Sequence, residues 1–303
     1  MKIINEDFRN ILFDYNTTVA LGMFDGVHIA HREIIKRAVL DTKINKTKSV
    51  VLTFEQDPDE FLYPDKKHSI ITENKTKIKL IEELDPDYLV LLKTNRELLN
   101  LEPEDFIEFL KNNIGIKKAI CGFDYKFGKK AKGNINLLKI YGNNYGYSLD
   151  VVDEIKINGF KVSSSVIREK LEKGLIIEAN ELLGYEFSIY GAVEKGNQIA
   201  REMGYPTANI YVDDRIALRN GVYATKTVIN GKEYSSISNI GIKPTFNGKQ
   251  KVLETHLFNT NINLYGKEIM VKFVRFIRDE QKFDSIINLK KRIQEDIIIA
   301  RNL

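Results

Sequence analysis

The sequence predicts a two-part fold, an α/β domain with a parallel sheet followed by a β-barrel domain. In residues 1–184, apolar runs typical of strands alternate with helical patterns, which favours a Rossmann-like parallel sheet with right-handed crossovers. From residue 185 to 303 the pattern changes to short segments of alternating apolar and polar residues, which favours a closed or nearly closed barrel. The chain has 303 residues, enough for two domains that each bury a core.

The composition excludes several classes of protein. Hydrophobic residues make up 43% and charged residues 29% of the chain, and no apolar run approaches the ~20 residues of a membrane helix. A single cysteine, Cys121, excludes an intrachain disulfide and favours a cytoplasmic location. The net charge of +4 is dispersed along the chain, so an RNA-binding role is the weaker alternative to an enzyme. The sequence leaves open whether the chain forms a homo-oligomer.

The first domain begins with a strand, a tight turn and a helix. Residues 19–21 form the strand, Gly22 and Gly26 the turn, and the helical pattern then follows. We expect further strands over 49–54, 88–92, 117–121 and 148–152, helices over 74–84 and 103–112, a hairpin around 158–159, and two closing helices over 165–183. In the second domain we expect strands over 188–193, 221–229, 234–240, 252–258 and 268–276, and an amphipathic helix over 284–299.

The strand–turn–helix at residues 19–35 is the first candidate site. Such a turn places backbone N–H groups and a helix N-terminus at the carboxyl edge of a sheet, where anions bind. His28 and His31 are three residues apart and share one face of the first helical turn, which suits a phosphate chain. The alternative is that the glycines only form the turn and His28 only caps the helix.

The string Gly22-Met-Phe-Asp-Gly-Val-His-Ile-Ala-His31 resembles the Gly-x-Phe-Asp-Gly-Val-His-x-Gly-His signature of the bacterial bifunctional riboflavin kinase/FAD synthetases. The N-terminal module of that family belongs to the nucleotidyltransferase superfamily. The resemblance implies that residues 1–184 transfer AMP from ATP to FMN, which yields FAD and pyrophosphate. It also implies catalytic roles for His28 and His31. The residues that it assigns to substrate binding in this string are Gly22, Phe24, Asp25 and Gly26.

Two later segments of the first domain resemble the same family. The loop Gly122-Phe-Asp-Tyr-Lys-Phe-Gly128 resembles a flavin-binding loop, so Asp124, Tyr125 and Phe127 are implied in flavin binding, and aromatic rings can stack on an isoalloxazine. The alternative is a loop that anchors the core. The string Val162-Ser-Ser-Ser-Val-Ile-Arg168 resembles the Ile-Ser-Ser-Thr-x-Ile-Arg motif. It implies phosphate contacts from Ser164 and Ser165 and charge neutralisation by Arg168, against the alternative of a helix cap with a surface arginine.

Three departures from the family pattern keep a second hypothesis open. Ala30 stands where the family has Gly, Asp57 where it has a histidine, and Val166 where it often has an arginine. The alternative function is therefore a monofunctional riboflavin kinase whose N-terminal domain is impaired or regulatory.

In the second domain, the stretch from Gly191 to Asn209 resembles the riboflavin kinase signature, a glycine-bearing loop that ends in Pro-Thr-Ala-Asn. Glycine loops let backbone donors reach phosphates, and Thr207 and Asn209 offer hard oxygen ligands for Mg²⁺. The alternative is a polar corner of the barrel. The nucleotide- and substrate-binding residues that the resemblance implies here are Gly191, Gly196, Gly204, Pro206, Gly221, Tyr223 and Asn239.

The segment Val252-Leu-Glu-Thr-His-Leu-Phe258 resembles the strand that carries the family's catalytic glutamate. On that match Glu254 is the general base that accepts the proton of the riboflavin 5′-hydroxyl as the γ-phosphoryl group of ATP transfers. His256 faces the same side of the strand and is given no role. The resemblance thus implies that residues 185–303 convert riboflavin to FMN with ATP and Mg²⁺. The partners are the small molecules riboflavin, FMN and ATP, with no nucleic acid and no membrane.

Overall fold

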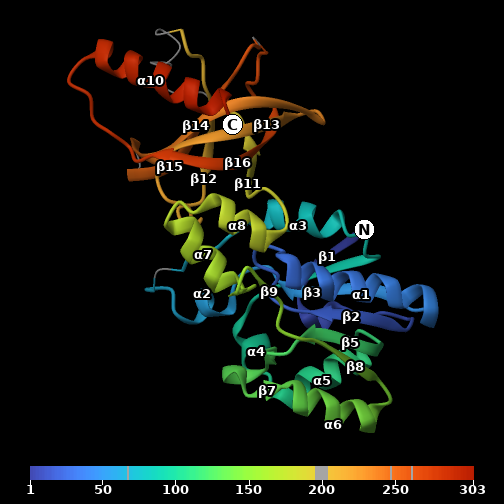
Figure 1. Cartoon of the computed structure of the whole chain (residues 1–303). Coiled ribbons are helices and arrows are strands. Elements are labelled where there is room, and N and C mark those ends of the chain that lie inside the picture. Colours follow the sequence, from blue (N-terminus) through green and yellow to red (C-terminus); the bar gives the residue numbers. More distant parts are fainter. Residues whose placement is uncertain (67, 195–203, 246–247, 261) are drawn as a thin grey trace. The chain divides into compact units, whose positions relative to one another are not determined.

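The computed structural model describes residues 1–66, 68–194, 204–245, 248–260 and 262–303 and divides the chain into two compact units (Figure 1). Unit 1 consists of Met1–His68 and Lys77–Ser163, and unit 2 consists of Ser69–Thr76 and Ser164–Leu303. Within the described part of the chain, we find no helix whose length and apolarity would let it span a membrane.

Unit 1 is built on a six-stranded sheet in the order β1-β4-β3-β2-β5-β8, with every neighbouring pair parallel. The strands are β1 (Lys2–Glu6), β2 (Thr17–Leu21), β3 (Lys48–Phe54), β4 (Tyr88–Leu92), β5 (Ile116–Gly122) and β8 (Ser148–Val152). All residues of β2 are buried, as expected for a central strand of a parallel sheet. The carboxyl ends of β2 and β3 therefore lie side by side and form one edge.

Helices and short elements connect these strands. The helices are η1 (Phe8–Asn10), α1 (Ile29–Asn45), α2 (Pro58–Leu62), α3 (Asn74–Glu82), α4 (Arg96–Leu99), α5 (Pro103–Asn112), η2 (Lys129–Ala131) and α6 (Ile135–Tyr145). Two small antiparallel strand pairs accompany them: β6 (Lys126–Phe127) pairs with β7 (Gly133–Asn134), and β9 (Lys156–Ile157) pairs with β10 (Phe160–Lys161). Helix α5 illustrates why they form, because Pro103 starts it, Glu104 and Asp105 favour its positive end, and Phe106 and Leu110 pack into the core.

Unit 2 contains an antiparallel sheet in the order β11-β16-β13-β14-β15-β12. Its strands are β11 (Ser188–Ala192), β12 (Ala208–Val212), β13 (Gly221–Ile229), β14 (Lys232–Thr245), β15 (Gly248–Leu257) and β16 (Glu268–Arg278). The N–H of Glu194 donates to the carbonyl of Asn209 over 2.8 Å and brings the two outer strands together. Gly191 permits this approach, since a Cβ there would lie 2.4 Å from Cγ2 of Ile210. The result is the nearly closed barrel that the sequence predicts.

The helices of unit 2 in the described part of the chain are α7 (Ser164–Glu172), α8 (Ile176–Leu183) and α10 (Ile286–Arg301). Helix α10 packs on the outer face of β13 and β14, where Ile297 and Ala300 contact Val222, Ala224 and Ile237 (Figure 1). The opposite face of the same strands carries a buried network of hydroxyl groups. Thr225 forms hydrogen bonds of 2.8 Å with both Ser236 and Ser238, and Ser238 forms one of 2.8 Å with Thr255. These buried polar groups are satisfied by one another.

The expected strands and helices are confirmed within a few residues, and several elements were not predicted, among them β1, α6 and β12. Strand β1 (Lys-Ile-Ile-Asn-Glu) is a short edge strand with a charged residue at each end and little burial, so it lacks the apolar signal of its neighbours. Helix α6 contains Gly142, which weakens the helical pattern but allows close packing, since a Cβ there would lie 2.8 Å from the carbonyl oxygen of Tyr147. Strand β12 directly follows Thr207, where the sequence suggests only a loop or corner.

Candidate active sites

The first candidate site lies at the carboxyl edge of β2 and β3 in unit 1. The turn after β2 has left-handed backbone at Gly26 (φ 79°) and also at Phe24 (φ 52°) and Val27 (φ 36°). Positive φ is costly for a β-branched residue, and such strain is typical of functional turns. Phe24 is fully buried, with its ring edge on His31 at 5.2 Å between centroids. A Cβ at Gly22 would approach the Phe24 ring to 3.0 Å.

His28 and His31 stack on each other at the start of α1. Their ring centroids are 3.6 Å apart and their planes differ by 16°. His28 is the N-cap of α1, and its Nδ1 accepts from the N–H of His31 at 3.4 Å, so the capping alternative describes part of what this residue does. The Nδ1 atom of His31 is buried and has no hydrogen-bond partner in the described part of the chain.

Both imidazoles are neutral near pH 7. Burial lowers the pKa of His28 to about 4. Burial holds the pKa of His31 well below its ordinary value, and repulsion from the neighbouring basic groups of His28 and Lys77 adds to this effect. The two rings can therefore donate and accept hydrogen bonds at this site but do not carry positive charge there.

Lys77 is a residue of this edge that the sequence analysis did not find. It is buried on α3, and its Nζ donates to the carbonyl of Phe54, at the carboxyl end of β3, over 3.1 Å. Burial lowers its pKa, while Asp25 and Asp57 act in the opposite direction. The sequence carries a signal for it, because Lys77 precedes the core residues Leu80 and Ile81 by three and four residues and therefore shares their face of α3.

The departures from the family pattern have ordinary local roles. Ala30 lies in the first turn of α1, and Asp57 is the N-cap of α2, accepting from the N–H of Asp59 at 2.9 Å. Val166 lies in the first turn of α7, the helix that also carries Ser164, Ser165 and Arg168. These last three residues belong to unit 2, whereas His28 and His31 belong to unit 1, so their common site stays a prediction.

The residues of the aromatic loop after β5 differ in burial: Phe127 is buried, Tyr125 is half-buried and Asp124 is exposed. Phe127 is buried against Phe106 at 5.4 Å between centroids and belongs to the core, as the anchoring alternative expects. The half-buried Tyr125 stacks on Phe127 at 5.8 Å. Asp124 is exposed and binds Lys161 at 3.1 Å, and the same ammonium lies over the ring of Phe123 at 4.6 Å.

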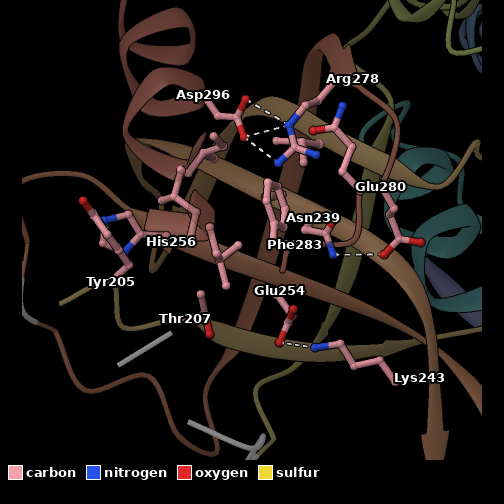
Figure 2. A pocket seen from close by; sticks show the side chains of 16 residues that line it. Tyr205, Thr207, Asn239, Lys243, Glu254, His256, Arg278, Glu280, Phe283 and Asp296 are labelled. Atoms are coloured by element: carbon pink, nitrogen blue, oxygen red, sulfur yellow. Dashed lines mark hydrogen bonds and ion pairs between the residues drawn. The ribbon is translucent and has the colours of Figure 1, made fainter. Parts of the chain in front are cut away.

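The second candidate site is a cavity of about 390 Å³ in unit 2, between the outer face of the barrel and α10 (Figure 2). Glu254 on β15 and Asn239 on β14 are direct cross-strand partners and both line it. Asn209 on β12 is the cross-strand partner of Glu254 on the other side, so these three polar residues form one row across three strands. Apolar and aromatic walls come from Ile237, Phe283, Leu289 and Ile293.

The charged groups of this cavity are engaged in pairs (Figure 2). Arg278 binds the carboxylate of Asp296 on α10 through three hydrogen bonds of 2.7–3.1 Å, and Asp296 is 1% exposed. Asn239 donates to Glu280 at 3.4 Å. Lys243 forms an ion pair with Oε1 of Glu254.

His256 contacts two neighbouring residues, Tyr205 and Pro206, at the rim of the cavity. Its Nδ1 donates to the carbonyl of Pro206 at 2.8 Å, and its ring meets that of Tyr205 edge-on at 5.6 Å between centroids. His256 and Glu254 face the same side of β15, as the strand alternation predicts. The cavity residues that sequence reasoning missed are Tyr205, Lys243, His256, Arg278, Glu280, Phe283 and Asp296.

A second cavity of about 580 Å³ adjoins the first, since Thr207 lines both. Pro206, Asn209 and Thr255 line it together with Thr260 and residues 262–265. Its surface is more polar than that of the first cavity and offers hydroxyl and amide oxygens.

Two other residues predicted for this site, Tyr223 and Gly221, are packed against other parts of the barrel. Tyr223 is fully buried, its hydroxyl donates to the carbonyl of Arg219, and its ring packs on Phe273 and Phe276. Gly221 (φ 147°) lies where a Cβ would be 2.4 Å from the carbonyl oxygen of Arg278. Gly204 is exposed, and Gly196 lies outside the described residues.

Together, the α/β unit with its strained turn before α1 and the barrel with its two adjoining cavities are the features of a two-domain enzyme of the phosphate-transferring class. A family model for FAD synthetase matches residues 11–166, and a model for riboflavin kinase matches residues 183–303. The chain belongs to the family of bifunctional riboflavin kinase/FMN adenylyltransferases.

The relatives cover nearly the whole chain. A bifunctional riboflavin kinase/FMN adenylyltransferase from Buchnera aphidicola subsp. Acyrthosiphon pisum is 39% identical over 305 residues, which are 99% of this chain and 97% of the relative. The protein of the same name from Bacillus subtilis is 34% identical over 285 residues, 92% of this chain and 90% of the relative. A crystal structure described as a macrolide-efflux protein from Streptococcus pneumoniae superposes with a TM-score of 0.86 at 28% identity and covers all of both chains.

Proposed function

We propose that this chain phosphorylates riboflavin to FMN with ATP and then transfers AMP from a second ATP to FMN, forming FAD and pyrophosphate. The domain of residues 185–303 carries the first reaction, and that of residues 1–184 the second. The single observation that supports the kinase most directly is the row Asn209–Glu254–Asn239, which places a carboxylate between two adjoining cavities. Ala30, Asp57 and Val166 sit at helix starts, where they leave the adenylyltransferase domain able to fold.

The two cavities suit the two substrates of the kinase. The first has the aromatic and aliphatic walls that a flat isoalloxazine needs, with polar groups at one end. The second has threonine hydroxyl and asparagine amide groups, whose O–H and N–H can donate hydrogen bonds to a nucleoside triphosphate. Thr207 borders both, so a phosphoryl group bound beside it can reach a flavin hydroxyl beside Glu254.

Mg²⁺ fits the donors at the junction of the cavities. The described residues contain no cluster of three acidic, histidine or cysteine side chains that could hold a metal alone. Thr207 and the buried Asn209 instead supply two hard oxygens, which matches the way Mg²⁺ is held by few protein groups together with phosphates and water. The bound ion supplies charge neutralisation on the phosphates.

In the kinase reaction Glu254 accepts the proton of the riboflavin 5′-hydroxyl. The hydroxyl oxygen forms a bond to the γ-phosphorus of ATP as the bond from that phosphorus to the bridging oxygen breaks, and ADP leaves. The apolar walls of the cavity hold the flavin and exclude water, which would otherwise compete as the acceptor.

In the adenylyltransfer reaction an oxygen of the FMN phosphate attacks the α-phosphorus of ATP, and pyrophosphate leaves. This nucleophile is already ionised, so positioning and charge neutralisation provide the catalysis and no general base is needed. The neutral imidazoles of His28 and His31 contribute hydrogen bonds to the phosphate chain. Positive charge comes from Arg168, with Ser164 and Ser165 as further phosphate contacts.

Two reciprocal variants test the assignment of reactions to domains. Glu254→Gln keeps the shape of the side chain but cannot accept a proton, so we expect FMN formation to fall by at least ~10²-fold while FAD formation from supplied FMN stays unchanged. His31→Ala removes a phosphate contact and should do the reverse. Product analysis with riboflavin or FMN, ATP and Mg²⁺ gives both rates in the same protein. A joint loss of both activities in either variant would show that the two reactions do not belong to separate domains.

A further inference from the structure

The base proposed for the kinase reaction is in contact with a cation. Lys243 on β14 lines the same cavity as Glu254, and its ammonium forms an ion pair with Oε1 of that carboxylate (Figure 2). The side chain of Lys243 is 36% exposed and that of Glu254 is 25% exposed, so both can be reached from the cavity. The ion pair uses one carboxylate oxygen and leaves Oε2 for a substrate hydroxyl.

The strand register does not force this contact. Glu254 is opposite Asn239 on β14, whereas Lys243 is opposite Gln250 on β15. The ion pair therefore forms because the lysine side chain extends along the strand toward the carboxylate. A long, flexible side chain of this kind can also reach another anion a few ångströms away.

Lys243 is the less constrained of two basic side chains that line the cavity, Lys243 and Arg278. Arg278, the other permanently charged cation that lines it, is bound to Asp296 by three hydrogen bonds and to the carbonyl of Asp279 by a fourth of 2.9 Å. The Nδ1 of His256 is engaged with Pro206. Among the described residues that line the cavity, Lys243 alone combines a positive charge with a single, partly exposed partner.

The chemistry brings a second anion to the same place. A hydroxyl bonded to Glu254 must lie roughly 3–3.5 Å from the γ-phosphorus for in-line attack. The oxygens of the transferring phosphoryl group then lie within about 6 Å of the Glu254 carboxylate, and hence close to the ammonium that contacts it. Once Glu254 has accepted the proton it is neutral and no longer holds the lysine electrostatically.

We propose that Lys243 is a further catalytic residue of the kinase site, paired with Glu254 before substrates react and bound to the phosphoryl group as it transfers. The proposal rests on the proposed function of this cavity. The proton of the 5′-hydroxyl passes to Glu254, the new oxygen–phosphorus bond forms as the bond to ADP breaks, and Lys243 stays protonated throughout. Its role is to neutralise first the carboxylate and then the phosphoryl oxygens.

Variants at Lys243 test this role in the full-length protein. Lys243→Met should lower kcat for FMN formation by about 10²-fold, since loss of one donor to a developing anion costs about that much. The KM for riboflavin should stay within about 3-fold, because riboflavin carries no phosphate. Lys243→Arg should recover most of the rate, and the neutral Lys243→Gln should not. Lys232→Met is the matched control, because Lys232 lies at the other end of β14 over the ring of Tyr234.

Product inhibition distinguishes contact with phosphate from simple support of Glu254. FMN differs from riboflavin only by the transferred phosphoryl group, so Lys243→Met should raise the inhibition constant of FMN in the riboflavin kinase assay by about 10-fold. FAD formation from FMN is measured in the same preparation and should not change. A wild-type kcat, or an unchanged inhibition constant for FMN, would overturn the proposal. Failure of the Glu254 assignment would be seen separately, as full FMN formation by Glu254→Gln.

Discussion

At the scale of single residues, the stacked histidines show how burial sets what a side chain can do. His28 and His31 would be cations at moderately acidic pH in water, but packing against Phe24 and against each other removes their solvation. Lys77 at the same edge of the sheet is likewise buried, and its ammonium donates to the carbonyl of Phe54. This edge of the sheet combines neutral imidazoles with a buried lysine, so the proposed phosphate contacts of His28 and His31 would be hydrogen bonds between neutral rings and the phosphates.

The buried histidines predict a dependence of stability on pH. The folded pKa of His28 is about 4, below its ordinary value of 6.5, so below pH 6.5 the unfolded chain takes up a proton that the folded chain does not. The contribution of the neutral His28 to the free energy of unfolding is fully present above pH 6.5 and is lost progressively toward pH 4. At pH 5 the loss is about 2 kcal/mol.

Urea denaturation followed by circular dichroism at pH 7 and pH 5 measures this loss. The variant His28→Asn keeps a side chain that can cap α1 but has no imidazole to titrate. Its free energy of unfolding should therefore change less between the two pH values than that of the wild type. An identical pH dependence of the two proteins would show that His28 is not held neutral by the fold.

At the scale of elements, the terminal helix is held by an ion pair as well as by apolar packing. Ile297 and Ala300 of α10 pack on β13 and β14, and Asp296, almost fully buried, binds Arg278 at the end of β16. The same helix provides Leu289 and Ile293 to the wall of the cavity. The position of α10 therefore sets the width of the proposed flavin site.

Removal of Asp296 should affect both stability and substrate binding. Asp296→Ala leaves the largely buried Arg278 without its partner, so we expect a loss of about 3–5 kcal/mol in the free energy of unfolding and a riboflavin KM raised by about 10-fold. Glu295→Ala removes an exposed partner of Arg292 on the same helix and should cost at most about 1 kcal/mol. Denaturation curves and riboflavin titrations of the two variants give the comparison, and equal effects would mean that the buried pair does not anchor α10.

At the scale of the whole molecule, FMN is the product of one proposed reaction and a substrate of the other. The residues proposed for the kinase all lie in unit 2, and FMN is small enough to diffuse between chains. Nothing in the chemistry of either reaction requires that the FMN made by one chain be used by the same chain.

A mixing experiment tests this independence. Glu254→Gln cannot make FMN and His31→Ala cannot use it, so each variant alone should form no FAD from riboflavin and ATP. A mixture of the two should form FAD after a lag in which free FMN accumulates. Chromatography of the products over time shows both species. If the mixture made FMN but no FAD while Glu254→Gln still adenylated supplied FMN, the intermediate would have to pass within one chain.

The sequence by itself determined the order of an α/β fold followed by a β-barrel, the strand–turn–helix with its glycines and histidines, and the barrel strands other than β12. It also singled out Glu254, whose role stays a prediction. Each of these depends on residues close together in the chain, where hydrophobic period and short motifs carry the information. Only the tertiary structure decided which polar residues meet. The row Asn209–Glu254–Asn239 and the ion pair of Lys243 depend on strand register, and the burial of Lys77 and Asp296 depends on which face each helix packs. It likewise assigned Tyr223 and Phe127 to the core, because an aromatic ring binds a ligand only where packing leaves its face accessible.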